Sequence, residues 1–182
     1  MTVLLSNQQK FLLDALDALG GANAHQLTEL LRPVFCAERP EVAPRIVEAA
    51  MRQMNRCNVS LCQDGELFYL PGRRPGQLQL EALDVMLELS GTGLMNYRCG
   101  KPPILLRFSV QEEKKVRQFT VTTPGADLYG IELSQVERII LLFDGQGTSH
   151  ILPVSNKQFF AVRQSDGTHR FFAVNGHSDR RY

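Results

Sequence analysis

The chain has 182 residues, of which 43% are hydrophobic and 21% charged, and its formal net charge is +1. This length suits one large domain or two small ones, and the composition is that of an ordinary globular protein. A net charge so close to zero excludes a strongly basic binder of nucleic acid, so any contact with DNA must use a local patch.

The N-terminal sequence MTVLLSNQQK lacks the basic start and the long apolar core of a signal peptide. Nowhere in the chain is an apolar run long enough to span a bilayer. These features predict a cytoplasmic protein with no membrane partner. The cysteines form no CxxC pair and show no paired histidine spacing, which predicts reduced thiols, no metal site and no cofactor. The cysteines are Cys36, Cys57, Cys62 and Cys99.

Three helices are expected in the first 56 residues. Ser6 and Gln9 fit a capping box, and leucines then recur at helical spacing until Gly20-Gly21. Asn23 suits the cap of a short second helix that ends soon after Pro33. A third helix is predicted from Pro44, a favourable first-turn residue, to about residue 55.

A hairpin is expected directly after the third helix. Beyond Arg56 the apolar period changes from 3.6 to 2, on both sides of Asp64-Gly65. Asp-Gly supplies the positive φ angles that a tight hairpin turn requires. Three helices followed by a hairpin within 70 residues is the element order of a winged helix.

The segment PGRRPG, residues 71–76, marks a boundary, because its prolines and glycines continue neither a helix nor a strand ladder. We therefore expect an α+β protein: a winged-helix domain over 1–72, a linker over 73–76, a mixed α/β domain over 77–176 and a tail over 177–182. The second domain should hold about five strands and at least two helices. The expected helices are 77–89 and 126–137; the expected strands are 104–110, 116–123, 138–144, 158–164 and 169–175, with 91–97 as a loop.

Arginines gather on one side of the predicted third helix. At about 100° per residue, Arg45, Arg52 and Arg56 fall within roughly 40° of one another, opposite an apolar arc. In a winged helix this helix enters the major groove, where arginine pairs with guanine or grips phosphates. The predicted contacts with double-stranded DNA are Arg45, Arg52, Gln53 and Arg56, with Arg73 and Arg74 just past the hairpin.

A second interpretation is a protein-interaction or dimerisation module. Helices often expose arginines to solvent, Glu48 lies near the same face, and residues 1–72 carry six Lys/Arg against eight Asp/Glu. In the last hairpin the pairs 159–160 and 171–172 are both Phe-Phe, and one ring of each pair should leave the core. Those rings would form a surface for a partner or a second copy, unless a helix covers them.

No enzyme is predicted. The stretch Glu112-Glu113-Lys114-Lys115 has the acidic-x-Lys spacing of metal-dependent nucleases, but it falls at an expected hairpin turn. No spacing singles out a second carboxylate, and no Ser or Cys nucleophile stands in a recognisable motif. The candidates without a supporting pattern are Asp127, Glu132, Asp144, His25, His150, His169 and His177.

The run RIVEAAMRQMNRCNVSLCQDGELFYLPG and the strand series ILLRFSV, VRQFTVTT and RIILLFD resemble the replication-relaxation type proteins of Gram-positive plasmids and conjugative elements. The resemblance rests on a general winged-helix pattern and on element order. It implies a winged helix joined to a degenerate endonuclease-like domain, and an accessory or regulatory role on the DNA of a mobile element, without catalysis.

Overall fold

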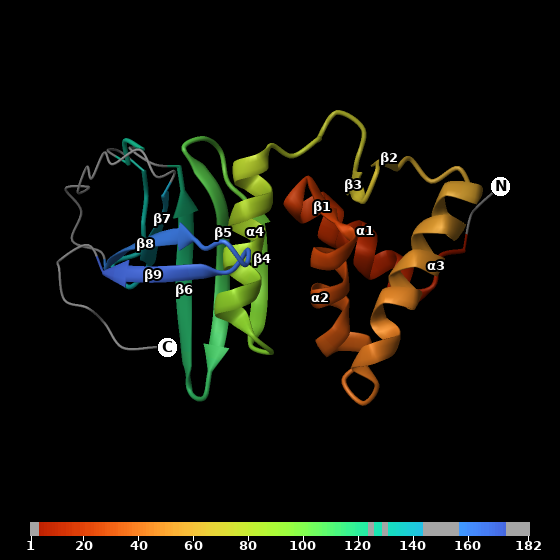
Figure 1. The fold of residues 1–182 in the computed structure, drawn as a ribbon, viewed down its shortest axis with the longest axis horizontal. Helices are drawn as coiled ribbons and strands as arrows, with labels where there is room; N and C mark the ends of the chain where they lie inside the picture. The colour runs from red at the N-terminus through yellow and green to blue at the C-terminus, as the bar shows by residue number, and fades with distance from the viewer. Residues whose placement is uncertain (1–3, 124–125, 129–130, 144–156, 174–182) are drawn as a thin grey trace. The chain divides into compact units, whose positions relative to one another are not determined.

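The computed structural model describes residues 4–123, 126–128, 131–143 and 157–173. Over these residues the chain forms four α-helices and two β-sheets, which confirms the α+β class (Figure 1). The chain divides into two compact units, residues 1–80 and residues 81–182.

The N-terminal unit holds three helices and a small sheet. Its strands run antiparallel in the order β1-β3-β2. The elements are α1 (Asn7–Leu19), β1 (Gly21–Asn23), α2 (Ala24–Phe35), the 3-10 helix η1 (Pro40–Val42), α3 (Ala43–Arg56), β2 (Cys62–Asp64) and β3 (Leu67–Tyr69).

Both predicted helix caps are present. The Gln9 amide N–H donates to the Ser6 hydroxyl over 3.2 Å, and the Ser6 N–H donates to the Gln9 side chain over 2.8 Å. Asn23 and Gln26 form the same reciprocal pair at the start of α2. Such caps satisfy backbone donors that the first turn of a helix leaves without partners.

The predicted hairpin is also present, with one change in its turn. The two-residue loop is Gly65-Glu66, because Asp64 pairs with Leu67 in the ladder. Gly65 takes a φ of 60° at the first loop position, as primed hairpin turns require. The sequence did not reveal β1, whose three residues are held by pairing with β3.

Residues of the expected linker pack onto the N-terminal unit. Arg73 donates to both the backbone carbonyl and the carboxylate of Asp17. A Cβ placed on Gly21 would lie only 2.7 Å from Cδ of Pro75. In the first turn of the next helix, the Gln79 side chain donates to the carbonyl of Leu19 over 2.9 Å. The unit therefore reaches residue 80, beyond the expected end at 72.

The C-terminal unit is built on a six-stranded sheet in the order β4-β5-β6-β7-β8-β9. β6, β7 and β8 pair in parallel, and the other neighbours pair antiparallel. The elements are α4 (Gln77–Ser90), whose first four residues belong to the N-terminal unit, β4 (Leu94–Cys99), β5 (Ile104–Glu112), β6 (Lys115–Thr122), β7 (Arg138–Phe143), β8 (Gln158–Arg163) and β9 (His169–Ala173). All five expected strands form, and β4 is a sixth strand where a loop was expected.

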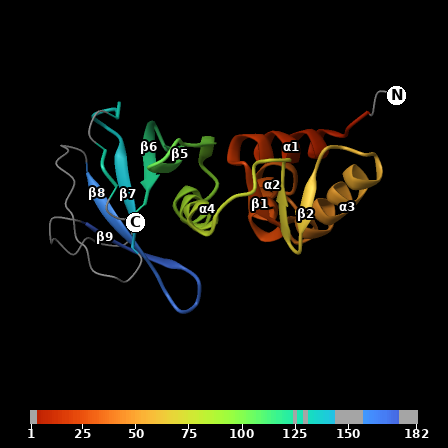
Figure 2. The same cartoon turned by 90° about the horizontal axis from the view of Figure 1, so that it is seen from above.

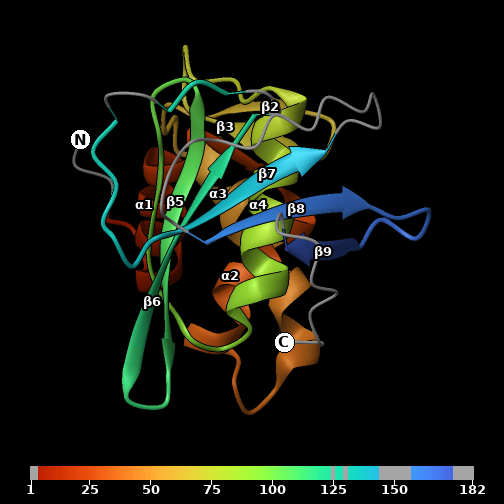
Figure 3. The same cartoon turned by 90° about the vertical axis from the view of Figure 1, so that its left-hand side faces the viewer.

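The two faces of this sheet are covered differently. Figures 2 and 3 show α4 lying along one face. On the other face Ala126 and Leu128 pack with Ile139 and Leu141. The helix expected over 126–137 is wrong for the described residues, since 126–128 and 131–137 are not helical. The apolar side chains of this irregular segment pack on the sheet. Their spacing in the sequence therefore matches contacts with the strands and not one face of a helix.

Candidate nucleic-acid interface

Helix α3 separates a buried face from a charged one. Val47, Ala50, Met51 and Met54 are buried against the rest of the N-terminal unit. The opposite face is exposed to solvent. It carries Arg45, Arg52, Gln53 and Arg56. Burial of the apolar side fixes the rotation of the helix, and so presents these polar side chains together.

A groove runs between α3 and the hairpin. Met51 and Phe68 contribute apolar side chains to it, and the Asn55 side-chain amide donates to the side-chain oxygen Oε1 of Gln63 over 3.3 Å. That bond links the helix to β2. The charged residues that line the groove are Glu48, Arg52 and Arg56.

Three of the predicted DNA contacts are already paired with acids. Arg52 pairs with Glu48 one turn away on α3, and Arg74 pairs with Asp64 on the hairpin. Arg73 lies 2.7 Å from the Asp17 carboxylate. All three guanidinium side chains are more than half exposed, at 60%, 62% and 54% respectively. Ion pairs this exposed contribute little and exchange partners readily.

Arg45 and Arg56 differ from the three paired arginines of the predicted contact set. Neither forms an ion pair with any other residue that the structure describes, and both are exposed. Residues 1–80 as a whole carry eight Lys/Arg and eight Asp/Glu, so the unit is neutral. On the exposed face of α3, attraction for a polyanion therefore depends on these two positions and on displacing Glu48 from Arg52.

The acidic-x-Lys stretch lies at a hairpin, as expected. Glu112 and Lys115 are opposite each other at the ends of β5 and β6, and Glu113 in the turn has a φ of 50°. The Glu112 carboxylate lies 2.6 Å from the Arg117 guanidinium. Among the described residues no group of three or more His, Cys, Asp or Glu is placed to hold a metal ion. Asp144 lies outside the described residues, as do His150 and His177.

Two buried clusters of hydrogen-bonded polar side chains in the C-terminal unit had no signal in the sequence. His169 has a fully buried side chain, with Nδ1 2.8 Å from Glu88 and Nε2 3.4 Å from Glu81 on α4. Glu137 is only 6% exposed and accepts hydrogen bonds from the Thr120 hydroxyl and the Ser134 N–H. Each cluster joins segments that are far apart in the sequence, where spacing carries no information.

The aromatic hairpin alternates as predicted. Phe159 is buried on the α4 side of the sheet, while Phe160 packs on the cluster of Ile139 and Leu141. Phe172 lies opposite Phe160 and is 44% exposed, with the Arg170 guanidinium over its ring. Of the two rings on the second face, one is therefore covered by an irregular segment and one is open to solvent.

Compared with known protein families, with curated proteins and with solved structures, the chain matches none. Within the described part of the chain, no helix has both the length and the apolar character that a bilayer crossing requires. All four cysteines lie in that part and carry free thiols.

Proposed function

We propose that the N-terminal unit is a winged helix and that the protein is a non-enzymatic, DNA-binding or DNA-associated factor. The observation that carries this proposal is the exposed face of α3, where Arg45, Arg52, Gln53 and Arg56 stand together beside a hairpin. The element order, with β1 between the first two helices and a sheet of β1-β3-β2, supports the same interpretation. The resemblance noted in the sequence adds an accessory role on mobile DNA.

The groove supplies groups suited to base edges as well as to phosphates. On α3, phosphates reach Arg56 in the groove and Arg45 on the same helix face without displacing an acid. Asn55 and Gln63 carry side-chain amides, which pair with adenine in the major groove. Glu48 opposes nonspecific binding, because it places a carboxylate in the same groove.

Binding of this kind should be modest and strongly dependent on salt. Each phosphate contact contributes about −0.9 to the slope of log affinity against log salt concentration. Arg45 and Arg56 alone predict a slope of about −2, and recruitment of all five arginines predicts about −4.5.

Fluorescence anisotropy on the full chain with a labelled random duplex tests this proposal, over salt from about 50 to 200 mM. The double variant Arg45→Ala/Arg56→Ala should reduce the slope by about 2 and the affinity by at least tenfold. Lys10→Ala is the matched control, an exposed cation on α1. Equal losses in the variant and the control, or no binding at the lowest salt, would overturn the proposal.

Glu48→Gln tests whether Arg52 reaches the DNA. The substitution removes the acid that holds Arg52 and keeps a polar side chain of the same shape. The affinity for the duplex should rise several-fold and the slope should steepen by about 1. An unchanged slope would place Arg52 outside the contact.

A protein-interaction role is the second candidate, favoured by the three paired arginines and by the exposed Phe172 ring. In this case the hairpin of β8 and β9 binds a second copy of the chain. Light scattering should then show a dimer that Phe172→Ser abolishes and that Val116→Ser, at another exposed apolar residue, leaves intact. A monomer at all concentrations would exclude the homodimer.

A further inference from the structure

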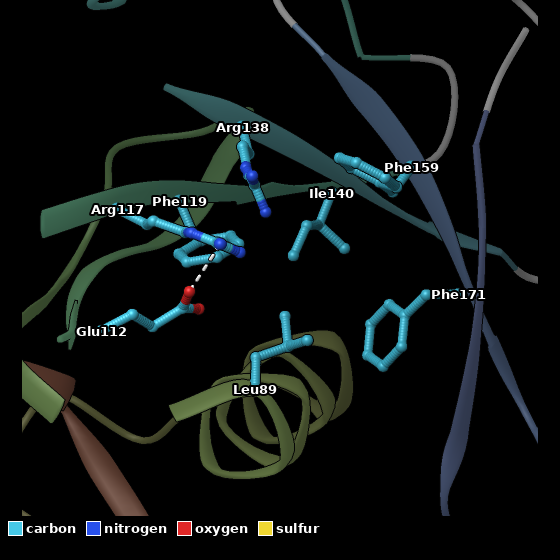
Figure 4. A pocket seen from close by; sticks show the side chains of 8 residues that line it. All are labelled: Leu89, Glu112, Arg117, Phe119, Arg138, Ile140, Phe159 and Phe171. Atoms are coloured by element: carbon cyan, nitrogen blue, oxygen red, sulfur yellow. Dashed lines mark ion pairs between the residues drawn. The ribbon is translucent and has the colours of Figure 1, made fainter. Parts of the chain in front are cut away.

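The cations on the two faces of the C-terminal sheet differ in whether they have partners. On the α4 face, Figure 4 shows Arg117 paired with Glu112 beside a small cavity. Arg138 in the same cavity lies over Phe119, with its guanidinium carbon 5.7 Å from the centre of the ring. The space between these side chains is about 40 Å³, which admits water but not a ring. Both cations of this cavity therefore have partners, and the cavity has no room for a ligand.

A larger pocket opens on the other face of the sheet, at the end of the hairpin formed by β4 and β5. We call it the hairpin-end pocket. It is open to solvent and measures about 500 Å³, within the range of small-molecule sites. A mostly polar groove of about 740 Å³ adjoins it and shares part of its lining. The cations of the pocket are Arg98, Lys101 and Arg107, its acid is Glu132, and Ile104 and Ile131 form an apolar wall.

Two of these cations are neighbours across the hairpin. Arg98 on β4 is directly opposite Arg107 on β5, so both side chains leave the sheet on the same face. Like charges in this position destabilise a sheet. Arg107 is compensated in part, because Nη2 donates to the carbonyl of Glu132 over 3.0 Å and Nε lies 3.7 Å from the Glu137 carboxylate. Nε of Arg107 still lacks a hydrogen-bond partner among the described residues.

Arg98 and Lys101 have no such compensation. Within the described part of the chain, neither side chain forms an ion pair or a hydrogen bond, and both residues are exposed. The turn that carries Lys101 is held in place, because the carbonyl of Lys101 accepts from the Ile104 N–H over 2.9 Å. The fold thus brings two uncompensated cations together beside a third, at a cost in stability that an anion would offset.

We propose that the hairpin-end pocket binds a phosphate group. The Arg98 guanidinium and the Lys101 ammonium hold the phosphate oxygens, and the group that carries the phosphate lies in the adjoining polar groove. Arginine matches the oxygens of a phosphate in geometry, and lysine binds them as a point charge. A phosphate monoester carries a charge of about −1.5 to −2 at pH 7, which offsets the two uncompensated cations. This site does not depend on DNA binding by α3.

Glu132 makes the pocket selective among anions. Its exposed carboxylate lines both the pocket and the adjoining groove, where it repels any negative ligand. A ligand with a single charge gains less from Arg98 and Lys101 than a doubly charged phosphate does, and it meets the same acid. The pocket should therefore prefer phosphate to a simple carboxylate. Two sources supply such a group, a small phosphate ester and the backbone of a nucleic acid.

Glycerol phosphate is a suitable probe, with glycerol as its uncharged match and acetate as a singly charged anion. Amide chemical shifts of the full chain should move saturably with glycerol phosphate, centred on residues 96–107, with a dissociation constant in the millimolar range or tighter. Acetate should bind at least about tenfold more weakly, and glycerol should give no saturable change. Equal binding of acetate, shifts centred elsewhere, or no saturation by about 10 mM would overturn the proposal.

Variants assign the binding to the pocket. The double variant Arg98→Gln/Lys101→Gln should weaken glycerol phosphate at least about tenfold. Lys114→Gln/Lys115→Gln is the matched control, because it removes the same charge from exposed residues at the other end of β5. Equal losses in the two double variants would contradict the assignment. Glu132→Gln should strengthen binding several-fold, and an unchanged or lower affinity in that variant would also contradict it.

The salt dependence of duplex binding identifies the source of the phosphate. If the source is a nucleic acid, Arg98→Gln/Lys101→Gln should reduce the slope of log affinity against log salt concentration by about 2. An unchanged slope, together with lost binding of glycerol phosphate, would identify a small phosphate ester. Absence of duplex binding in the unsubstituted chain would overturn the role proposed for α3, whereas the titration with glycerol phosphate tests the pocket separately.

Discussion

The two units of this protein use ionic side chains in opposite ways. In the N-terminal unit Arg52 and Arg73 form ion pairs in which both partners are more than half exposed. In the C-terminal unit Glu137 and His169 are almost completely buried, and each bonds to more than one neighbour. The first kind of pair can give way to a ligand at little cost, whereas the second kind holds secondary structure elements together.

This difference indicates where function and stability lie in the chain. Exposed pairs are screened by salt and worth at most about 1 kcal/mol, so evolution can change them to tune binding. Removing the donors of a buried carboxylate, or removing the carboxylate from its donors, lowers the free energy of unfolding far more. Substitutions at the exposed pairs and at the buried clusters should therefore cause small and large losses, respectively, in the free energy of unfolding.

The largest effect is expected for Glu137→Ala. The substitution removes the acceptor of the Thr120 hydroxyl and the Ser134 N–H, and also the carboxylate 3.7 Å from Nε of Arg107. The free energy of unfolding should fall by about 3 kcal/mol. Urea denaturation measures this, with Glu132→Ala as the exposed control. A loss no larger than that of the control would mean that Glu137 is not structural.

A smaller but clear loss is expected for His169→Leu. The leucine fills much of the same space but leaves Glu88 and Glu81 on α4 without the imidazole. We expect a loss of about 2 kcal/mol in the free energy of unfolding. His25→Leu is the control, since the His25 side chain is 74% exposed. Thermal unfolding of the two variants side by side would show the difference, and matching melting temperatures would contradict it.

The exposed pairs should hardly change stability. Asp17→Asn and Glu48→Gln each remove the acid from an arginine at the protein surface. The free energy of unfolding should change by no more than about 1 kcal/mol in either variant, and less at high salt. Urea denaturation at low and high salt measures both effects. A loss as large as that of His169→Leu would end the distinction between the units.

The smallest effect is a pH dependence at the tip of the last hairpin. The Thr168 hydroxyl and then the Thr168 N–H donate to the Asp166 carboxylate, and these bonds hold its pKa below the ordinary value. The contribution of this turn to stability is therefore present above the unfolded pKa and is lost as the pH falls through the folded pKa. Carboxyl NMR titration should show the low pKa returning toward the ordinary value in Thr168→Val. An unchanged pKa in that variant, which keeps the Thr168 N–H, would rule out the hydroxyl hydrogen bond as its main cause.

Local signals in the sequence predicted the parts of the fold that are local. The caps at Ser6 and Asn23 and the turn at Gly65 each act within four residues, and all three were found in the sequence. β1 and β4 were missed for different reasons. β1 is held by pairing with β3, far along the chain, and β4 is an edge strand whose residues show no alternating apolar pattern. The helix predicted over 126–137 was wrong for the described residues, because the apolar residues there pack on the sheet from an irregular segment.

The same limit applies to the candidate interface. The stripe on α3 follows from helical periodicity, and the i,i+4 spacing of Glu48 and Arg52 made their pairing foreseeable. The pairing of Arg73 with Asp17 spans 56 positions and has no pattern in the sequence. The charges available to a ligand thus depend on contacts that only the folded chain reveals.

The close approach of Gly21 to Pro75 sets an order of events during synthesis. Strand β1 packs against Pro75, which lies more than fifty positions later in the chain, and the Gln79 side chain binds the carbonyl of Leu19 just before β1. Until the ribosome has added these residues, β1 lacks both contacts. A fragment that ends at residue 72 would lack the contacts of Pro75 and Gln79, whereas a fragment that extends to residue 80 includes both.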